Sequence, residues 1–183
     1  MASAFSHAFV TVAFGRLSRH PVMTPRALLL GTFCAVLPDI DVVGFGYGVH
    51  YEDLWGHRGL THSLFFAALL AVFLVAFWYR RESKTVMAGM GLYFFLSAAS
   101  HGLLDALTDG GLGVAFFSPF DPTRYFFPIR PIAVSPIGVR EFFSEPGLRV
   151  LQSELMWIWV PTAVLASLMR AFRGDWPRAN QPQ

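Results

Sequence analysis

Two long runs without charged side chains constrain this sequence more than any other feature. Residues 59–79 and residues 85–104 contain no Asp, Glu, Lys or Arg over 21 and 20 positions. A bilayer hydrocarbon core about 30 Å thick is crossed by about 20 consecutive apolar residues in a helix. The two runs, separated by a short basic connection, therefore predict two adjacent membrane-spanning helices.

The composition points to the same environment. Hydrophobic residues make up 54% of the 183 residues and charged residues only 14%, whereas a soluble domain has about 25% charged residues. A soluble domain of this size cannot bury so much apolar surface. The composition also excludes a disordered chain and a nucleic-acid-binding protein, because the arginines are dispersed. A lone cysteine, Cys34, excludes an intrachain disulfide framework and a Cys-based zinc site.

Three shorter apolar segments complete the predicted fold. Residues 4–17 and 26–37 are each too short to cross the bilayer upright, so we expect them to form a hairpin joined at 18–25. Residues 155–169 contain Pro161, which a membrane helix tolerates. The expected fold is all-α: an integral membrane bundle of four to five helices, two short N-terminal, two long central and one C-terminal. We expect residues 1–183 to form a single membrane-embedded domain.

The stretch from 109 to 148 differs from the rest of the chain. It is rich in Pro, Gly, Phe and Arg. The prolines oppose a regular helix, and the density of aromatic residues opposes a solvated linker. We therefore predict an irregular, ordered lid over one end of the helices, in which a β-hairpin is allowed but not required.

Basic residues predict the orientation. Lys and Arg concentrate in cytoplasmic loops of membrane proteins, and alternating helices place three basic groups at one end of the bundle. The groups are Arg16, Arg19 and Arg26; Arg80, Arg81 and Lys84; and Arg170, Arg173 and Arg178. We expect a multi-pass protein of the inner (cytoplasmic) membrane with this end and the C-terminus in the cytoplasm. Arg124, Arg130 and Arg140 in the lid, with Arg149 directly after it, oppose this signal.

Seven ionisable residues fall at the opposite, periplasmic end of the predicted bundle, although they come from four separate segments. They are His7, Asp39, Asp41, His57, His62, His101 and Asp105. Histidines scattered through a core would not be sorted to one end in this way. The convergence of these residues is the main functional signal in the sequence.

Local spacing indicates how these side chains meet. His101 and Asp105 are four residues apart, so they project from one helix face. We expect Pro38 to end a helix, with Asp39 and Asp41 on an extended turn whose side chains point the same way.

The remaining two histidines lie in the motif GHRGLTHS. Gly56 and Gly59 permit a tight turn there, so that His57 and His62 can both face inward. Unpaired polar groups are costly in an apolar protein, and a divalent ion satisfies them. Nitrogen and carboxylate ligands without thiolate suit zinc, or manganese or iron.

Seven ligands exceed the four of one zinc ion, so we expect one to two ions, with an aspartate bridging a pair. A metal pair suits in-line displacement at a phosphoester. Arg58, between the histidines, is a candidate catalytic residue that binds phosphate, or else an ion-pair partner of Asp53. Arg124 and Arg130 in the lid are candidates for the same catalytic role, or else anchors to lipid headgroups. Thr61 is either an outer-sphere partner of a ligand or a helix cap.

Two functions fit a His/Asp cluster in a membrane. The first is a metal-dependent hydrolase, and the alternative is a transporter or ion-handling protein that uses the same residues. Transporters are commonly built from repeats with a binding site near the bilayer midplane. The sequence has no internal repeat, and the cluster lies at helix ends, so the hydrolase is favoured.

Several motifs together resemble a known family. They are HAF, LPDID, GHRGLTHS, SHGLLDALTDGG and FSPFDPTRYFFPIRPIAVSPIG, in this order over about residues 5–140. They resemble the LexA-regulated, membrane-bound metal-dependent hydrolase family (YdjM-like), which is distantly similar to zinc-dependent phospholipase C. The resemblance implies an inner-membrane hydrolase with the seven residues above as metal ligands. Its expected partners are membrane lipid and an anionic phosphoester substrate, with no nucleic acid.

Overall fold

Helices make up almost all of the regular structure. The computed structural model describes residues 1–172. Within these residues the extended backbone pairs only at two isolated bridges, Thr108 with Ile132 and Val114 with Tyr125. The elements in chain order are α1 (Ala4–Gly15), α2 (Pro25–Val36), η1 (Leu37–Tyr47), η2 (Leu60–His62), α3 (Leu64–Leu74), η3 (Val75–Tyr79), α4 (Lys84–Ala106), α5 (Val139–Phe142), α6 (Glu145–Glu154), η4 (Leu155–Trp159) and α7 (Val160–Phe172).

Within residues 1–172, three continuous helices are long and apolar enough to cross a membrane. They are Pro25–Tyr47 and Lys84–Ala106, with 23 residues each, and Glu145–Phe172, with 28 residues. Two apolar helices, Ala4–Gly15 and Leu64–Tyr79, are shorter. The predicted all-α membrane fold is confirmed.

Two boundaries differ from the sequence prediction. In the uncharged run 59–79, the α-helix begins only at Leu64, because the residues before it form a turn that carries His62. The Ser63 hydroxyl caps this helix by accepting a hydrogen bond from the Phe66 N–H. Pro38 does not end its helix. It interrupts the α-helical hydrogen bonding because it has no N–H, but the chain continues as a 3₁₀-helix to Tyr47. Asp39 therefore lies on a helix and not on an extended turn.

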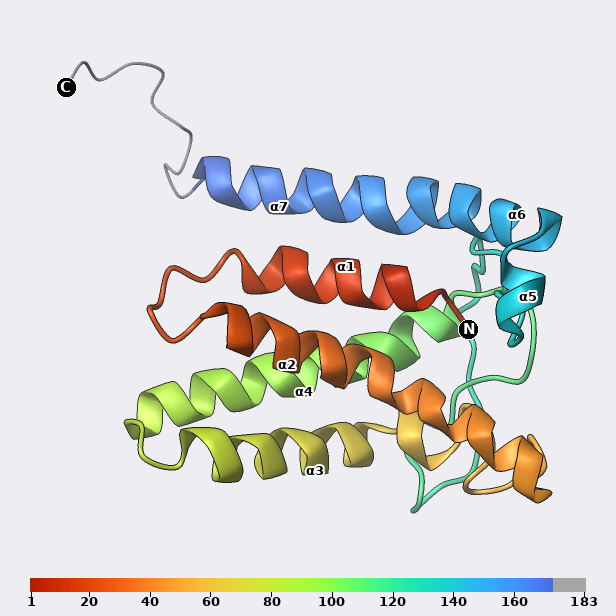
Figure 1. The fold of residues 1–183 in the computed structure, drawn as a ribbon, viewed down its shortest axis with the longest axis horizontal. Helices are drawn as coiled ribbons and strands as arrows, with labels where there is room; N and C mark the ends of the chain where they lie inside the picture. The colour runs from red at the N-terminus through yellow and green to blue at the C-terminus, as the bar shows by residue number, and fades with distance from the viewer. Residues whose placement is uncertain (173–183) are drawn as a thin grey trace.

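The helices run side by side along the long axis of the molecule (Figure 1). The α1–α2 and α3–α4 connections and the end of α7 lie at one end, which we call the basic end. The lid, α5, η1 and the start of the chain lie at the other, which we call the site end. The predicted basic groups share the basic end as expected, apart from Arg173 and Arg178, which lie outside the described residues.

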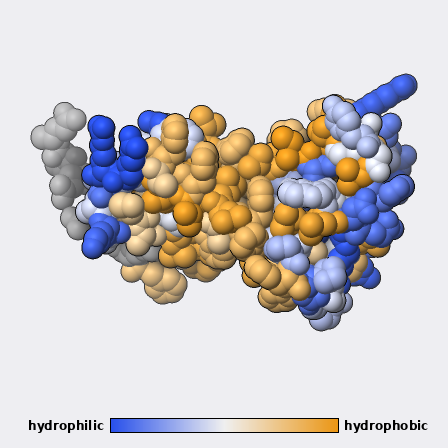
Figure 2. Space-filling model, turned by 90° about the horizontal axis from the view of Figure 1, so that it is seen from below, coloured by the Kyte–Doolittle hydropathy of each residue, from blue (hydrophilic) through white to orange (hydrophobic). Residues whose placement is uncertain are grey.

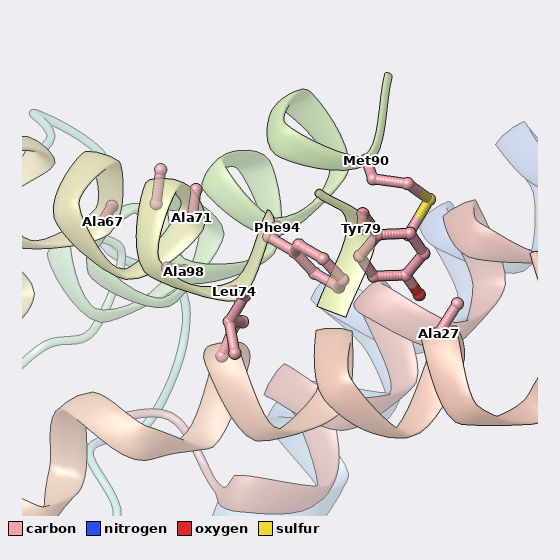
Figure 3. Packing of buried hydrophobic residues seen from close by; sticks show 10 residues of the cluster. Ala27, Ala67, Ala71, Leu74, Tyr79, Met90, Phe94 and Ala98 are labelled. Carbon is pink, nitrogen blue, oxygen red and sulfur yellow. The ribbon is translucent and has the colours of Figure 1, made fainter. Parts of the chain in front are cut away.

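Close helix packing produces the main apolar core. Small side chains, among them Ala67, Ala71 and Ala98, let α3 and α4 approach each other, and the larger Phe94 and Met90 fill the space beside them (Figure 3). Lipid offers no hydrophobic gain for helix association, so membrane helices rely on this kind of close packing. The core therefore holds α4 firmly between α2 and α3.

Two glycines bring α1 and α2 against the Tyr93 side chain of α4. A Cβ atom on Gly31 would lie 2.3 Å from the Tyr93 hydroxyl oxygen, and one on Gly15 would lie 2.8 Å from it. Real Cβ atoms do not approach so closely, so both positions require glycine for this packing. The three helices that carry His7, Asp39 and His101 are thereby held together.

The surface is divided as expected for a membrane protein. An apolar band separates hydrophilic groups at the two ends (Figure 2). Large apolar side chains such as Val72, Phe73 and Leu92 are exposed in the helices that form this band. Such a surface would aggregate in water, but it suits contact with lipid.

The lid covers the site end of α3 and α4. Residues 109–138 are irregular, whereas helices α5 and α6 occupy most of the rest of the predicted lid. The irregular part is joined to the bundle by backbone hydrogen bonds, including Leu64 N–H to Phe116 O and Phe127 N–H to Ala106 O. The lid is therefore attached to the ends of the helices that carry the predicted ligands.

Candidate metal centre

The structure brings all seven predicted metal ligands together at the site end. Six of them are buried, and the side chain of Asp39 is 12% exposed. They form a continuous network of contacts between α1, η1, the turn before α3, and α4. The residues are His7, Asp39, Asp41, His57, His62, His101 and Asp105.

The cluster has two parts that share His62. In the first part, which we call the inner group, one donor atom from each of four residues lies within 4.8 Å of the others: Asp39, His62, His101 and Asp105. In the second part, which we call the outer group, the same holds for Asp41, His57 and His62.

The hydrogen bond of His101 assigns the proton on its ring. Its Nδ1 lies 2.7 Å from the carbonyl oxygen of Ala35. A carbonyl oxygen only accepts hydrogen bonds, so Nδ1 carries the proton. In the neutral ring, Nε2 then presents its lone pair to the inner group.

The same reasoning applies to His62. Its Nδ1 lies 3.2 Å from Asp41 Oδ2 and 3.0 Å from the hydroxyl oxygen of Thr61. Thr61 donates its one proton to Asp41 Oδ2, at 2.7 Å, so it can only accept from the ring. Nδ1 of His62 is therefore the donor, and Nε2 presents a lone pair in the neutral ring.

These two Nε2 atoms face each other at 3.0 Å. Two lone pairs at this distance repel unless a cation lies between them or one ring takes an extra proton. Asp39 Oδ1 lies 3.2 Å from His101 Nε2 and 3.6 Å from His62 Nε2. A single proton cannot satisfy all these acceptors, but a divalent ion can.

The spacing of the inner donors also fits an ion. Metal–ligand bonds of about 2.0–2.2 Å place the donors of a four-coordinate zinc about 3.3 Å apart. Asp105 Oδ2 lies 3.6 Å from His62 Nε2 and 3.9 Å from His101 Nε2. With the separations of 3.0, 3.2 and 3.6 Å given above, the donor–donor distances lie on both sides of the spacing expected for zinc.

His7 borders the inner group without belonging to it. Its ring stacks on His101 with the centroids 3.8 Å apart, and its Nε2 lies 3.6 Å from Asp105 Oδ1. Both ring nitrogens of His7 are buried without a hydrogen-bond partner, as are Asp39 Oδ1 and Asp105 Oδ2. Buried polar atoms without a hydrogen bond are costly, and a cation among these atoms would offset that cost.

The turn between η1 and α3 depends on glycine as predicted. A Cβ atom on Gly56 would lie 2.2 Å from the carbonyl oxygen of His50, and one on Gly59 would lie 2.4 Å from that of Leu54. The backbone can therefore fold closely enough to bury both histidines of the motif only when glycine stands at these positions.

The electrostatics of the turn separate its two histidines. Burial lowers the pKa of His57, although the hydrogen bond to Asp41 opposes this effect. Burial also disfavours the His62 cation, but contacts with the carboxylates of Asp105, Asp39 and Asp41 outweigh it and raise the pKa of His62 to about 10. Without an ion, the inner group therefore holds a proton on His62.

Arg58 is fully buried and directed toward protein groups. Its Nε lies 3.2 Å from Asp105 Oδ2, and its Nη atoms donate to Thr108 Oγ1 and to the carbonyl oxygens of Gly110 and Leu112 at 2.7–3.0 Å. The residue has a left-handed backbone with φ of 64°, which costs free energy for a side chain of this size. Its partner is thus Asp105 and not Asp53, and it ties the lid to the cluster.

The two lid arginines lie in different surroundings. Arg124 is half-buried and donates to the backbone carbonyl oxygens of Tyr51 and His57, at 2.9 and 3.0 Å. Arg130 is exposed, with its guanidinium 4.5 Å from the centre of the Phe126 ring. Arg124 therefore supports the turn that carries His57, whereas Arg130 has its guanidinium open to solvent.

Glu154 is a buried acidic residue that the sequence reasoning missed. It lies in the third long apolar helix, and it accepts hydrogen bonds from both the backbone N–H and the hydroxyl of Ser3. The neighbouring Ala2 N–H donates to Asp105 Oδ1 at 2.7 Å. A Glu inside an apolar span is a recognisable signal, and here it attaches the start of the chain beside the inner group.

Comparison with known proteins places the chain in a family of inner membrane proteins. Residues 1–176 match the family described as "YdjM inner membrane protein". The chain is 38% identical over 172 residues to "Inner membrane protein YbcI" of Escherichia coli (strain K12), covering 92% of this chain and 97% of that protein. No solved structure matches the chain. The protein therefore belongs to the YdjM family of inner membrane proteins.

Proposed function

We propose that this protein is a membrane-bound, metal-dependent hydrolase that acts on a phosphoester of a lipid or lipid-linked substrate. The observation that carries the proposal is the pair of Nε2 lone pairs of His62 and His101, which face each other at 3.0 Å with two carboxylates beside them. Nitrogen and oxygen donors without sulfur suit zinc, and also manganese or iron. A divalent ion bound there would supply Lewis-acid activation of water and of a phosphoryl oxygen.

The position of the cluster supports a lipid-linked substrate. The inner group lies at the ends of apolar helices, and the lid around it exposes both apolar side chains, such as Phe120 and Ile129, and the basic Arg130. Aromatic and basic residues gather at the level of lipid headgroups. A phosphoester at that depth lies within reach of the site without leaving the membrane surface.

The residues of the chain have separate roles in this proposal. Among the four inner ligands, only the Asp39 side chain is partly exposed, so a substrate would reach the inner group past Asp39. Arg58 holds the Asp105 carboxylate and the lid. The Arg130 guanidinium can donate bidentate hydrogen bonds to the oxygens of an anionic substrate. We place the site at the periplasmic side of the inner membrane, with the C-terminus in the cytoplasm.

Two parts of the family resemblance belong to the proposal. The distant similarity to zinc-dependent phospholipase C is implied by the family resemblance, and the His and Asp donors of the inner group are compatible with it. LexA regulation of the gene is likewise an expectation that the resemblance implies.

Metal analysis combined with a substrate assay tests the proposal. The full chain, purified in detergent, should hold divalent metal and hydrolyse a phosphodiester or phosphomonoester substrate. His62→Ala and Asp105→Ala should each lose most of the metal and the activity. His20→Ala is the matched control, because His20 is exposed on the α1–α2 connection at the other end of the bundle. Stoichiometric metal in both ligand variants would contradict the ligand assignment.

The burial of the cluster favours a second candidate, an ion-handling protein. Three of the four inner ligands are buried, which resembles an occluded ion site. In that case, purified protein in vesicles would move a divalent ion across the membrane without hydrolysing any phosphoester. Hydrolysis in detergent without transport in vesicles distinguishes the enzyme from this alternative.

A further inference from the structure

We propose that the centre holds one metal ion and not two, and that Asp41 is a positioning residue that holds the ligand His62 in place. This inference rests on the proposed metal-dependent function. It keeps the four residues of the inner group as ligands, so that His7 borders the site without binding the ion, and it reassigns Asp41 and His57. Both remain necessary for the site, but as partners of a ligand.

The distances within the two groups carry this distinction. The outer group is joined at hydrogen-bond length: His57 Nδ1 lies 2.7 Å from Asp41 Oδ1, and Thr61 Oγ1 lies 2.7 Å from Asp41 Oδ2. Of the five inner donor separations given above, four are longer, at 3.2–3.9 Å. The fifth, at 3.0 Å, joins two ring nitrogens that are both acceptors in the neutral state. Protons join the facing atoms of the outer group in hydrogen bonds. In the inner group, two ring nitrogens that are both acceptors face each other, so these atoms need a metal ion or an extra proton between them.

Both oxygens of Asp41 already have donors. Oδ1 accepts from His57, and Oδ2 accepts from Thr61 and faces Nδ1 of His62. A second ion would have to displace these donors from a side chain that is 1% exposed. The carboxylate is therefore arranged as an acceptor of hydrogen bonds and not as a metal ligand. Asp105 differs, because its Oδ2 accepts no hydrogen bond and has the Arg58 guanidinium beside it only at ion-pair distance, 3.2 Å.

The arrangement has a direct effect on His62. An acceptor at Nδ1 fixes the tautomer of the ring, directs Nε2 into the inner group and makes the ring a stronger ligand. The carbonyl oxygen of Ala35 does the same for His101. Each of the two inner histidines thus has its own acceptor, one a carboxylate and the other a backbone carbonyl.

Metal titration of matched variants tests the assignment. Full-length protein in detergent is stripped with a chelator and titrated with Zn²⁺, and with Co²⁺ to follow its visible absorption. Asp41→Asn and Asp39→Asn make the same small change in neighbouring carboxylates. We expect one ion per wild-type chain. We expect Asp41→Asn to bind one ion with affinity about 10–100-fold lower and an altered Co²⁺ spectrum, and Asp39→Asn to lose stoichiometric binding.

Two results would overturn the inference: two ions per wild-type chain with one lost in Asp41→Asn, or an Asp41→Asn variant that binds as tightly as wild type. Wild-type protein that binds no ion would instead overturn the proposed function. If Asp41→Asn fails to fold, Thr61→Val takes its place, because it removes only the hydroxyl that donates to Asp41. We expect weaker binding at unchanged stoichiometry from Thr61→Val, and unchanged affinity would contradict the positioning role.

Discussion

His62 and His101 direct their Nε2 atoms at each other across 3.0 Å, while the opposite nitrogen of each ring is held by an acceptor. In a neutral pair this arrangement is repulsive. Three polar groups from different parts of the chain, Asp41, Thr61 and the Ala35 carbonyl, maintain it. The structure therefore keeps two ligands in a geometry that only a bound cation or an extra proton stabilises.

Competition between that proton and a metal ion should make metal binding depend on pH. The raised pKa of His62, about 10, means that the ring is protonated at neutral pH in the absence of metal. An ion must displace this proton, so affinity should rise with pH, by about tenfold per unit between pH 6 and 8 for one proton released. Zn²⁺ titrations at three pH values, corrected for the competing chelator, measure the slope. A flat profile would show that binding does not involve His62.

Arg130 and Arg124 should respond differently to substitution. Arg130→Ala should lower turnover of a phosphoester by about tenfold, equal to about 1.4 kcal/mol of transition-state stabilisation, with unchanged metal content. Arg124→Ala should instead lower thermal stability, because its guanidinium bonds to backbone carbonyl oxygens are lost. Turnover and melting temperature are measured on both variants. Normal turnover in Arg130→Ala would leave that residue as an anchor to lipid headgroups.

Arg58 should be the most important arginine for stability. Arg58→Ala removes the guanidinium closest to the buried Asp105 carboxylate, together with three hydrogen bonds to Thr108 and to the start of the lid. Removing one partner of a buried ion pair costs about 3–5 kcal/mol. Thermal unfolding in detergent measures the loss, with the exposed Arg149→Ala as the control that should change little. Equal stability of the two variants would contradict the assignment of Arg58.

The packing of α2 on α4 predicts opposite effects at two glycines. Gly31→Ala should destabilise the protein by about 1–3 kcal/mol, because its Cβ would overlap the Tyr93 hydroxyl. Gly89→Ala in α4 should be neutral or stabilising by up to about 1 kcal/mol, because no neighbouring atom lies within 4 Å of the new Cβ and alanine favours a helix more than glycine does. Melting temperatures give the comparison. Tyr93→Phe should partly restore the melting temperature of Gly31→Ala, because it removes the overlapping hydroxyl. If the double variant is no more stable, the Tyr93 hydroxyl is not the source of the strain.

Single cysteines test the proposed orientation. In a Cys34→Ala background, Thr123→Cys in the lid should react with a membrane-impermeant thiol reagent added to cells with a permeable outer membrane. Glu82→Cys, between α3 and α4 at the basic end, should react only after the inner membrane is opened. Both positions are exposed. The reverse pattern of labelling would place the site in the cytoplasm.

Local features of the sequence were sufficient for the membrane fold and for most of the cluster. The length of an apolar run is compared directly with the thickness of a bilayer, and the i, i+4 spacing places His101 and Asp105 on one helix face whatever surrounds them. Alternation of helix direction then sorted the seven polar residues to one end. Helix boundaries were less accurate, because the backbone around His62 is bent by tertiary contacts that apolar composition does not record.

The tertiary structure alone decided which atoms of these residues meet. Whether His62 presents Nε2 or Nδ1 to Asp39 depends on which ring nitrogen Asp41 and Thr61 face. Similarly, the pairing of Arg58 with Asp105 depends on how the lid returns to α4. The physical reason is the range of the interactions. Hydropathy and helical period act between neighbours in the chain, whereas hydrogen bonds and metal coordination depend on distances between segments that only packing determines.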